Sequence, residues 1–131
     1  MQRIPAGVFT ILTLAGIFWL TLAPRPLGDE PPKLFEGADK VVHAIMFGGL
    51  AMMIMLDWQR KHGWKRAGLI LMMASAMFSS CLGIAIEFLQ DYMHLGRGFD
   101  NWDIVADIIG AFLFAFLWWC FQKIWSVTPC K

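Results

Sequence analysis

Six polar residues of the sequence fall into three pairs, each spaced so that its two members share one face of a helix. The pairs are Asp39 with His43, Glu87 with Gln90, and Asp103 with Asp107. Side chains three or four residues apart are neighbours on a helix surface. An imidazole and several carboxylates gathered in this way can transfer protons to and from a substrate, or bind its polar groups. Chemistry of this kind requires the three pairs to meet in space.

Two cations lie close to these pairs in the sequence. Lys40 directly follows Asp39, and Arg97 lies between the second and the third pair. Lysine and arginine can hold a phosphate or carboxylate group, and arginine does so with two parallel hydrogen bonds. We therefore predict a ligand-binding site. Its predicted binding residues are Asp39, Lys40, Gln90, Arg97, Asp100, Asp103 and Asp107.

A catalytic role for the same site would fall to His43 and Glu87. His43 is the candidate general base, oriented by a carboxylate such as Asp39 or Glu87, and a buried glutamate can serve as an acid. The outer polar motifs contain no serine or cysteine, so substrate or water would have to act as the nucleophile. Metal sites in helical bundles usually combine carboxylates with more than one histidine. We therefore predict neither a metal ion nor a cofactor.

A structural explanation competes with the functional one. An aspartate at the start of a helix is often an N-cap, which would account for Asp100 and Asp103. A single interior histidine is often satisfied by its neighbours. Glu87 and Asp107, however, each lie a turn inside their expected helices. Ionisable groups at membrane depth are rare and usually mark a functional site.

The elements that position these residues are expected to be membrane helices. Hydrophobic residues make up 58% of the 131 residues and charged residues 16%, whereas soluble domains have about 45–50% and about 25%. A chain of this length forms one domain, 1–131, and cannot hide so much apolar surface from water. The net charge is +1 without a basic patch, which argues against a nucleic-acid partner. The three cysteines have no spacing typical of a zinc site or a disulfide framework.

Four apolar runs predict an all-α fold, a polytopic membrane protein with four transmembrane helices in an up-down bundle. Each run approaches the roughly 20 residues that cross a bilayer. The expected helices cover about residues 5–23, 41–58, 67–90 and 103–125. Because successive helices alternate in direction, the start of the second, the end of the third and the start of the fourth lie on one side of the membrane. The three polar pairs then lie at the same depth.

The distribution of lysine and arginine indicates which side this is. Cytoplasmic segments of membrane proteins carry an excess of these residues. The densest group lies between the second and third runs and consists of Arg60, Lys61, Lys65 and Arg66. We therefore predict that both termini are cytoplasmic and that the polar pairs lie near the outer leaflet.

Three motifs, "DKVVHAIMFGGLA", "GIAIEFLQ" and "RGFDNWDIVADIIGA", occur in that order within the four-helix pattern. Together they resemble the VanZ-like family of small bacterial integral membrane proteins, over roughly residues 39–111. The matching positions are Asp39, Lys40, His43, Glu87, Gln90, Arg97, Asp100 and Asp103. The family pattern usually has asparagine where this chain has Asp107. The resemblance implies a protein of the bacterial cytoplasmic (inner) membrane and cell envelope, in a family associated with low-level resistance to the glycopeptide teicoplanin.

We consider three functions for the predicted site. The first is a module that binds or handles an envelope lipid, a lipid-linked envelope precursor or a cell-wall-related anionic ligand at an outer-leaflet polar pocket. The second is a membrane-embedded transferase or hydrolase that uses His43 and Glu87 as acid and base. The third is a structural subunit that stabilises a membrane protein partner and has no ligand of its own.

Overall fold

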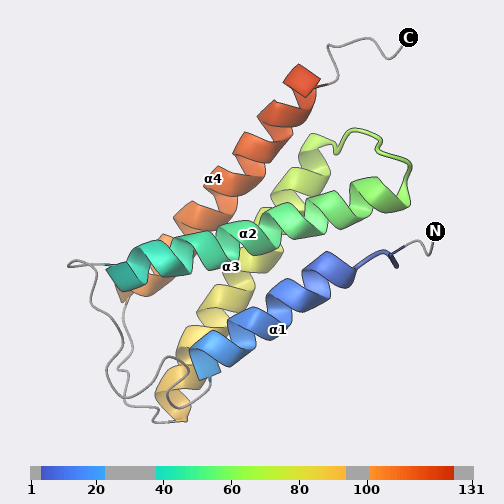
Figure 1. Cartoon of the computed structure of the whole chain (residues 1–131). Coiled ribbons are helices and arrows are strands. Elements are labelled where there is room, and N and C mark those ends of the chain that lie inside the picture. The colour runs from blue at the N-terminus through green and yellow to red at the C-terminus, as the bar shows by residue number, and fades with distance from the viewer. Residues whose placement is uncertain (1–3, 23–37, 94–100, 126–131) are drawn as a thin grey trace.

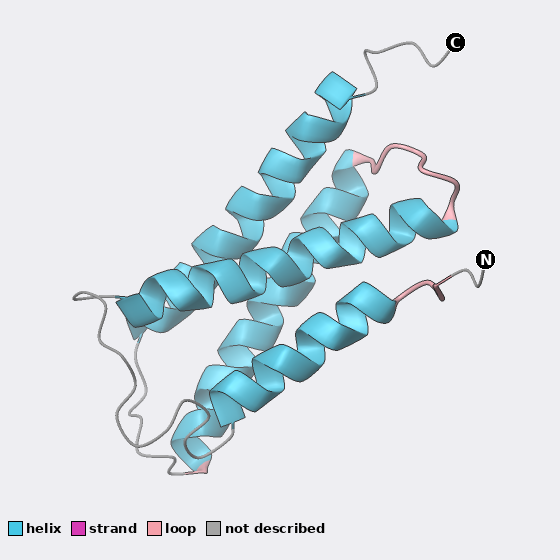
Figure 2. Cartoon of the chain, in the orientation of Figure 1, coloured by secondary structure: helices cyan, strands magenta, loops and turns pink. Residues whose placement is uncertain are grey.

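The computed structural model describes residues 4–22, 38–93 and 101–125, and within them it contains four α-helices and no strand (Figure 1, Figure 2). The helices are α1 (Val8–Leu22), α2 (Ala38–Lys61), α3 (Leu69–Tyr92) and α4 (Asn101–Trp125). The prediction of an all-α fold is confirmed. Compared with the expected ranges, α2 is longer at both ends. α1 begins later, because Gly7 adopts φ +93° in a turn that precedes the helix.

Consecutive helices run in opposite directions, so the bundle has two distinct ends (Figure 1). The C-terminal ends of α1 and α3 lie at the same end as the N-terminal ends of α2 and α4. α2 packs most extensively against α4 and also contacts α1 and α3. The packing of α2 on α4 therefore decides which side chains of these two helices can meet.

Three of the helices are long and apolar enough to cross a membrane, with candidate spans Lys40–Lys61, Leu69–Tyr92 and Asn101–Trp125. α1 is also apolar but has 15 residues. Large apolar side chains cover the outside of the bundle, and Ile70, for example, is 86% exposed. Such a surface is unfavourable in water and is suited to lipid tails. The fold is that of an integral membrane bundle, as predicted.

Small residues allow α2 and α4 to approach each other closely. A Cβ atom added to Gly110 would collide with the backbone of Ala44. One added to Gly48 would lie 2.5 Å from Phe114 Cδ2 and 2.7 Å from the Gly110 carbonyl oxygen. Close backbone contact at small residues is common between membrane helices, because lipid supplies no hydrophobic force to bring helices together. This contact lies within one turn of the polar residues on both helices.

Hydrogen-bonded amides connect the helices at the opposite end of the bundle. The side-chain oxygen of Gln122 accepts hydrogen bonds from Gln59 Nε2 at 2.6 Å and from the Ala67 backbone nitrogen at 2.9 Å. Its Nε2 donates to the Ala67 carbonyl oxygen at 2.6 Å. Trp118 donates to Gln59 at 2.8 Å. These polar groups are satisfied within the protein, so they form a structural connection between α2, α4 and the segment before α3.

A buried carboxylate at the same end attaches α2 to the start of α1. Asp57 Oδ2 accepts hydrogen bonds of 2.8 Å from both the backbone nitrogen and the hydroxyl group of Thr10. Asp57 Oδ1 accepts a third from Arg60 at 3.2 Å. The first N–H groups of a helix have no partner within that helix. Asp57 therefore caps α1 from a neighbouring helix and has a structural role.

Candidate functional site

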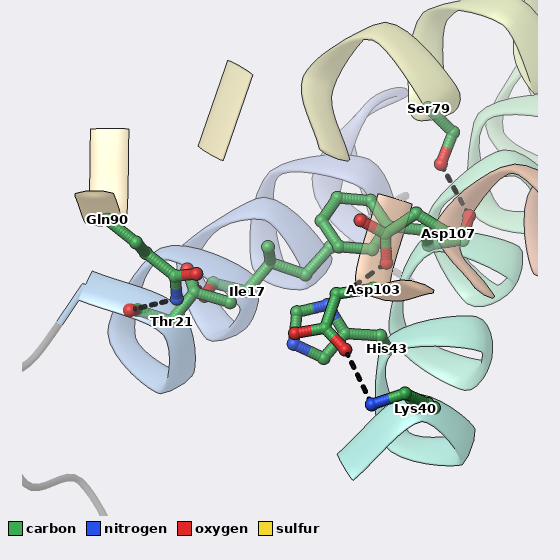
Figure 3. Close-up of polar contacts among 9 residues, drawn as sticks. Ile17, Thr21, Lys40, His43, Ser79, Gln90, Asp103 and Asp107 are labelled. Carbon is green, nitrogen blue, oxygen red and sulfur yellow. Dashed lines mark hydrogen bonds and ion pairs between the residues drawn. The ribbon is translucent and has the colours of Figure 1, made fainter. Parts of the chain in front are cut away.

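Two polar contacts connect the start of α2 to the start of α4 (Figure 3). Lys40 Nζ lies 3.5 Å from Asp103 Oδ1, and His43 Nδ1 lies 3.0 Å from Asp107 Oδ1. Lys40 and His43 are three residues apart in α2, and Asp103 and Asp107 are four apart in α4. The two contacts therefore lie on successive helical turns, and we call them the α2–α4 ladder.

The two contacts of the α2–α4 ladder differ in exposure. The side chains of Lys40 and Asp103 are 36% and 14% exposed, whereas those of His43 and Asp107 are 5% and 1% exposed. The first contact thus lies at the edge of the bundle and the second in its interior. An exposed pair contributes little to stability, whereas removing one partner of a buried pair leaves the other uncompensated.

Asp107 orients the imidazole of His43. An ionised carboxylate only accepts hydrogen bonds, so Asp107 Oδ1 favours the ring form that carries a proton on Nδ1. Nε2 is then the ring nitrogen left to take part in proton transfer. We predicted that a carboxylate such as Asp39 or Glu87 would orient this ring. In the structure a carboxylate supplied by α4, Asp107, contacts Nδ1.

The second carboxylate oxygen of Asp107 points towards α3. A Cβ atom added to Gly83 would lie 2.6 Å from Asp107 Oδ2, so α3 can approach this carboxylate only because residue 83 has no side chain. Asp107 Oδ2 is buried and has no hydrogen-bond partner in the part of the chain that the structure describes. A buried acceptor without a donor costs about 1–3 kcal/mol. The site therefore retains an unsatisfied acceptor in its interior.

α3 brings Glu87 and Gln90 to the same end of the bundle. Glu87 is 2% exposed and lies near enough to His43 to interact with it electrostatically. Gln90 Nε2 donates a hydrogen bond of 2.6 Å to the backbone carbonyl oxygen of Thr21 in α1 (Figure 3). Gln90 therefore has a structural partner in α1, in addition to the ligand-binding role that we predicted.

The structure thus gathers predicted site residues from three helices, and we call this group the polar cluster. It consists of Lys40, His43, Glu87, Asp103 and Asp107. Asp39 lies in the first turn of α2, but its side chain, together with Arg97 and Asp100, falls outside the described residues. Across 4–22, 38–93 and 101–125, no three His, Cys, Asp or Glu side chains are grouped so as to hold a metal ion.

A comparison with protein families assigns the chain as a whole. The model of the VanZ/LLP1 family matches residues 7–122, which include every member of the polar cluster. The chain belongs to the VanZ/LLP1 family. The predicted resemblance is confirmed. No curated protein and no solved structure matches the chain significantly.

One polar contact of this VanZ/LLP1 protein was not expected from the sequence. Ser79 Oγ donates a hydrogen bond of 2.5 Å to the backbone carbonyl oxygen of Phe47 and so connects α3 to α2 (Figure 3). Ser79 lies four residues before Gly83, on the same face of α3. A serine inside an apolar membrane helix commonly bonds to a neighbouring helix, and this signal would have identified it.

The polar cluster of this VanZ/LLP1 protein has two chemical capacities. Its edge presents the ammonium group of Lys40, which can hold a phosphate or carboxylate as a compact positive charge. Its interior presents carboxylates and an oriented imidazole, which accept hydrogen bonds and protons. The arrangement therefore suits a ligand that is anionic at one end and carries polar hydrogens at the other.

Proposed function

We propose that this VanZ/LLP1 protein binds the headgroup of an envelope lipid, or of a lipid-linked envelope precursor, in the polar cluster. The observation that carries the proposal is the α2–α4 ladder, which leads from the half-exposed Lys40 to the buried His43–Asp107 pair. Ionisable side chains inside membrane helices are costly and usually line the path of a substrate or ion. A lipid in the surrounding leaflet would meet Lys40 with its phosphate and extend its remaining polar groups inwards.

The proposal includes an orientation: the bacterial inner membrane, both termini cytoplasmic and the polar cluster in the outer leaflet. The exposed cations Lys61, Lys65 and Arg66, at the opposite end of the bundle, support it, because cytoplasmic segments are enriched in such residues. An outer-leaflet site would have access to lipid-linked cell-wall precursors. This would relate the site to the teicoplanin resistance associated with VanZ-like proteins.

Cysteine labelling tests the orientation. In a variant without Cys81, Cys120 and Cys130, single cysteines are introduced in place of His62 or Asp91, which are both exposed and lie at opposite ends of the bundle. A membrane-impermeant maleimide applied to spheroplasts should label the Asp91→Cys protein and should label the His62→Cys protein only after permeabilisation. The reverse pattern would place the polar cluster on the cytoplasmic side.

The Glu87→Gln variant tests ligand binding, because it keeps the shape of the side chain and removes its charge. We expect near-normal membrane abundance and thermal stability of this variant. Its binding of phosphatidylethanolamine should be about tenfold weaker, because one charge-assisted contact is lost. Cells that depend on the protein should become more susceptible to teicoplanin. Ser80→Ala is the matched control, since Ser80 is buried in the same helix and its hydroxyl group donates to the Ala76 carbonyl oxygen of that helix. Wild-type binding and resistance in Glu87→Gln would show that Glu87 has no part in a working site.

One observation favours acid–base catalysis as a second function. Asp107 holds Nδ1 of His43 at 3.0 Å and so orients the imidazole as carboxylates do in many catalytic sites. A substrate hydroxyl or water would then lose its proton to Nε2. This function would be established if the wild-type protein forms product from a bound lipid precursor and the His43→Gln variant binds the same lipid without forming product. Binding without any turnover in the wild-type protein would exclude it for that lipid.

A further inference from the structure

Two aspartate oxygens of the polar cluster are buried without a hydrogen bond to any described residue. Asp107 Oδ2 and Asp103 Oδ1 are both buried and have no hydrogen bond among the described residues, although Asp103 Oδ1 forms the 3.5 Å ion pair with Lys40. Ionised carboxylates can only accept hydrogen bonds. Among the described residues, Asp107 Oδ2 therefore lacks a donor, and Asp103 Oδ1 has the long contact to the Lys40 ammonium group but no hydrogen bond.

The balance of charge in the polar cluster indicates the same kind of ligand. In the described part of the chain it combines the carboxylates of Glu87, Asp103 and Asp107 with Lys40 and His43, and Asp103 acts electrostatically on both His43 and Asp107. An anion that entered the interior would meet these carboxylates and, among the described residues of the polar cluster, would find only Lys40 and His43 as donors, which the carboxylates already surround. A donor group would instead reduce the repulsion among the carboxylates.

The geometry of Asp107 makes its free oxygen a fixed recognition element. Its Oδ1 is held by His43 at 3.0 Å, its side chain is 1% exposed, and the backbone of α3 at Gly83 lies directly beside Oδ2. A carboxylate held in this way cannot turn to satisfy itself elsewhere. A ligand that supplies an N–H or O–H group to it would thus be selected by position as well as by charge.

We propose that the part of the ligand that enters the polar cluster is a hydrogen-bond donor, either a primary ammonium group or a sugar hydroxyl, which donates to Asp107 Oδ2 and Asp103 Oδ1. The inference rests on the proposed lipid-binding function and specifies its ligand class. Lys40 contacts the phosphate at the edge of the bundle, and the donor group lies deeper. Among lipids of equal phosphate charge, those with N–H groups bind more tightly than those without.

Three lipids distinguish the donor chemistry. Phosphatidylethanolamine and phosphatidylcholine have the same phosphate and the same positive charge, but only the first has N–H donors; diglucosyldiacylglycerol has hydroxyl donors and no charge. Competition for the purified full-length protein in nanodiscs, read by native mass spectrometry, should favour phosphatidylethanolamine over phosphatidylcholine by about tenfold, the equivalent of one charge-assisted hydrogen bond. A preference for the glucolipid over phosphatidylcholine would identify a hydroxyl as the donor. Equal binding of all three would overturn the inference.

Asparagine variants connect this preference to the two carboxylates. Asp107→Asn adds an N–H group where an acceptor is required. The ratio of phosphatidylethanolamine binding to phosphatidylcholine binding should then fall close to one. Asp103→Asn, at the better-exposed position, should lower the same ratio. This variant tests the inference if the Asp107→Asn protein does not fold. Asp57→Asn is the matched control, because it neutralises a buried aspartate at the opposite end of the bundle and should leave the ratio unchanged.

The Lys40→Gln variant separates failure of this inference from failure of the proposed function. Lys40→Gln should weaken both phospholipids equally, since each has the phosphate, and leave their ratio unchanged. Equal wild-type binding of all three lipids, with the two phospholipids weakened by Lys40→Gln, would overturn the donor inference and leave lipid binding intact. A wild-type protein that binds none of the three lipids would overturn both.

Discussion

Replacing Gly110 with alanine should cost the protein roughly 3 kcal/mol of stability, the upper part of the usual range for overpacking. The new Cβ atom would collide with the carbonyl oxygen of Ala44 and lie 2.5 Å from its Cα atom. Both are backbone atoms of α2, so no side-chain rotation can relieve the collision, and the two helices must separate. Unfolding of the purified variant in detergent, followed by circular dichroism against denaturant, measures the loss.

Gly49→Ala is the control for this prediction. Apart from the adjoining backbone of α2, no atom of the described residues lies within 4 Å of a Cβ atom added to Gly49, whereas the neighbouring Gly48 faces Phe114 across the helix contact. Because alanine favours the helix over glycine by about 0.5–1 kcal/mol, Gly49→Ala should be neutral or stabilising. Equal stability of the Gly110→Ala and Gly49→Ala proteins would contradict the close packing of α2 on α4.

The pairing of His43 shows where sequence reasoning reaches its limit. The spacing of polar residues indicated which of them could share a helix face, and Asp103 and Asp107 both contact α2 as this spacing allows. The alternation of helices placed these residues and Glu87 at one end of the bundle. The partner of His43 depends in addition on how each helix is rotated about its axis. Apolar residues surround most of a membrane helix, so hydrophobic periodicity does not reveal this rotation. Asp107 could therefore not be preferred over Asp39 or Glu87.

Close packing supplies the information that periodicity lacks. The contact of Gly110 with Ala44 sets the rotation of α2 against α4, and glycines alone do not show which of them lie in a contact. Gly48 and Gly49 are adjacent in the sequence, yet a Cβ atom added to Gly48 would meet α4 and one added to Gly49 would not. The bond from Gln90 to α1 was equally inaccessible, because it depends on the position of a helix distant in sequence.

The largest effect at the site itself is expected from Asp107→Ala, which should destabilise the protein by about 3–5 kcal/mol, the usual cost of removing one partner of a buried pair. His43 would remain in the interior, 4% exposed, without the acceptor that holds its Nδ1. Lys40→Ala removes the other contact of the α2–α4 ladder and is the matched comparison. Its side chain is 36% exposed, so the cost should be about 1 kcal/mol or less.

A second substitution distinguishes the loss of the pair from the loss of packing. In the Asp107→Ala protein, the buried imidazole of His43 has lost its hydrogen-bond acceptor. His43→Leu replaces this imidazole with an apolar side chain, and such replacements of buried polar groups often restore stability. We therefore expect the double variant to regain a large part of the stability lost in Asp107→Ala, measured by the same denaturant titration. Recovery of stability without recovery of the phosphatidylethanolamine preference would show that the fold tolerates the absence of the pair and that lipid recognition requires it. A double variant no more stable than Asp107→Ala would instead assign the cost to the cavity beside Gly83, and the His43–Asp107 contact would then contribute little to stability.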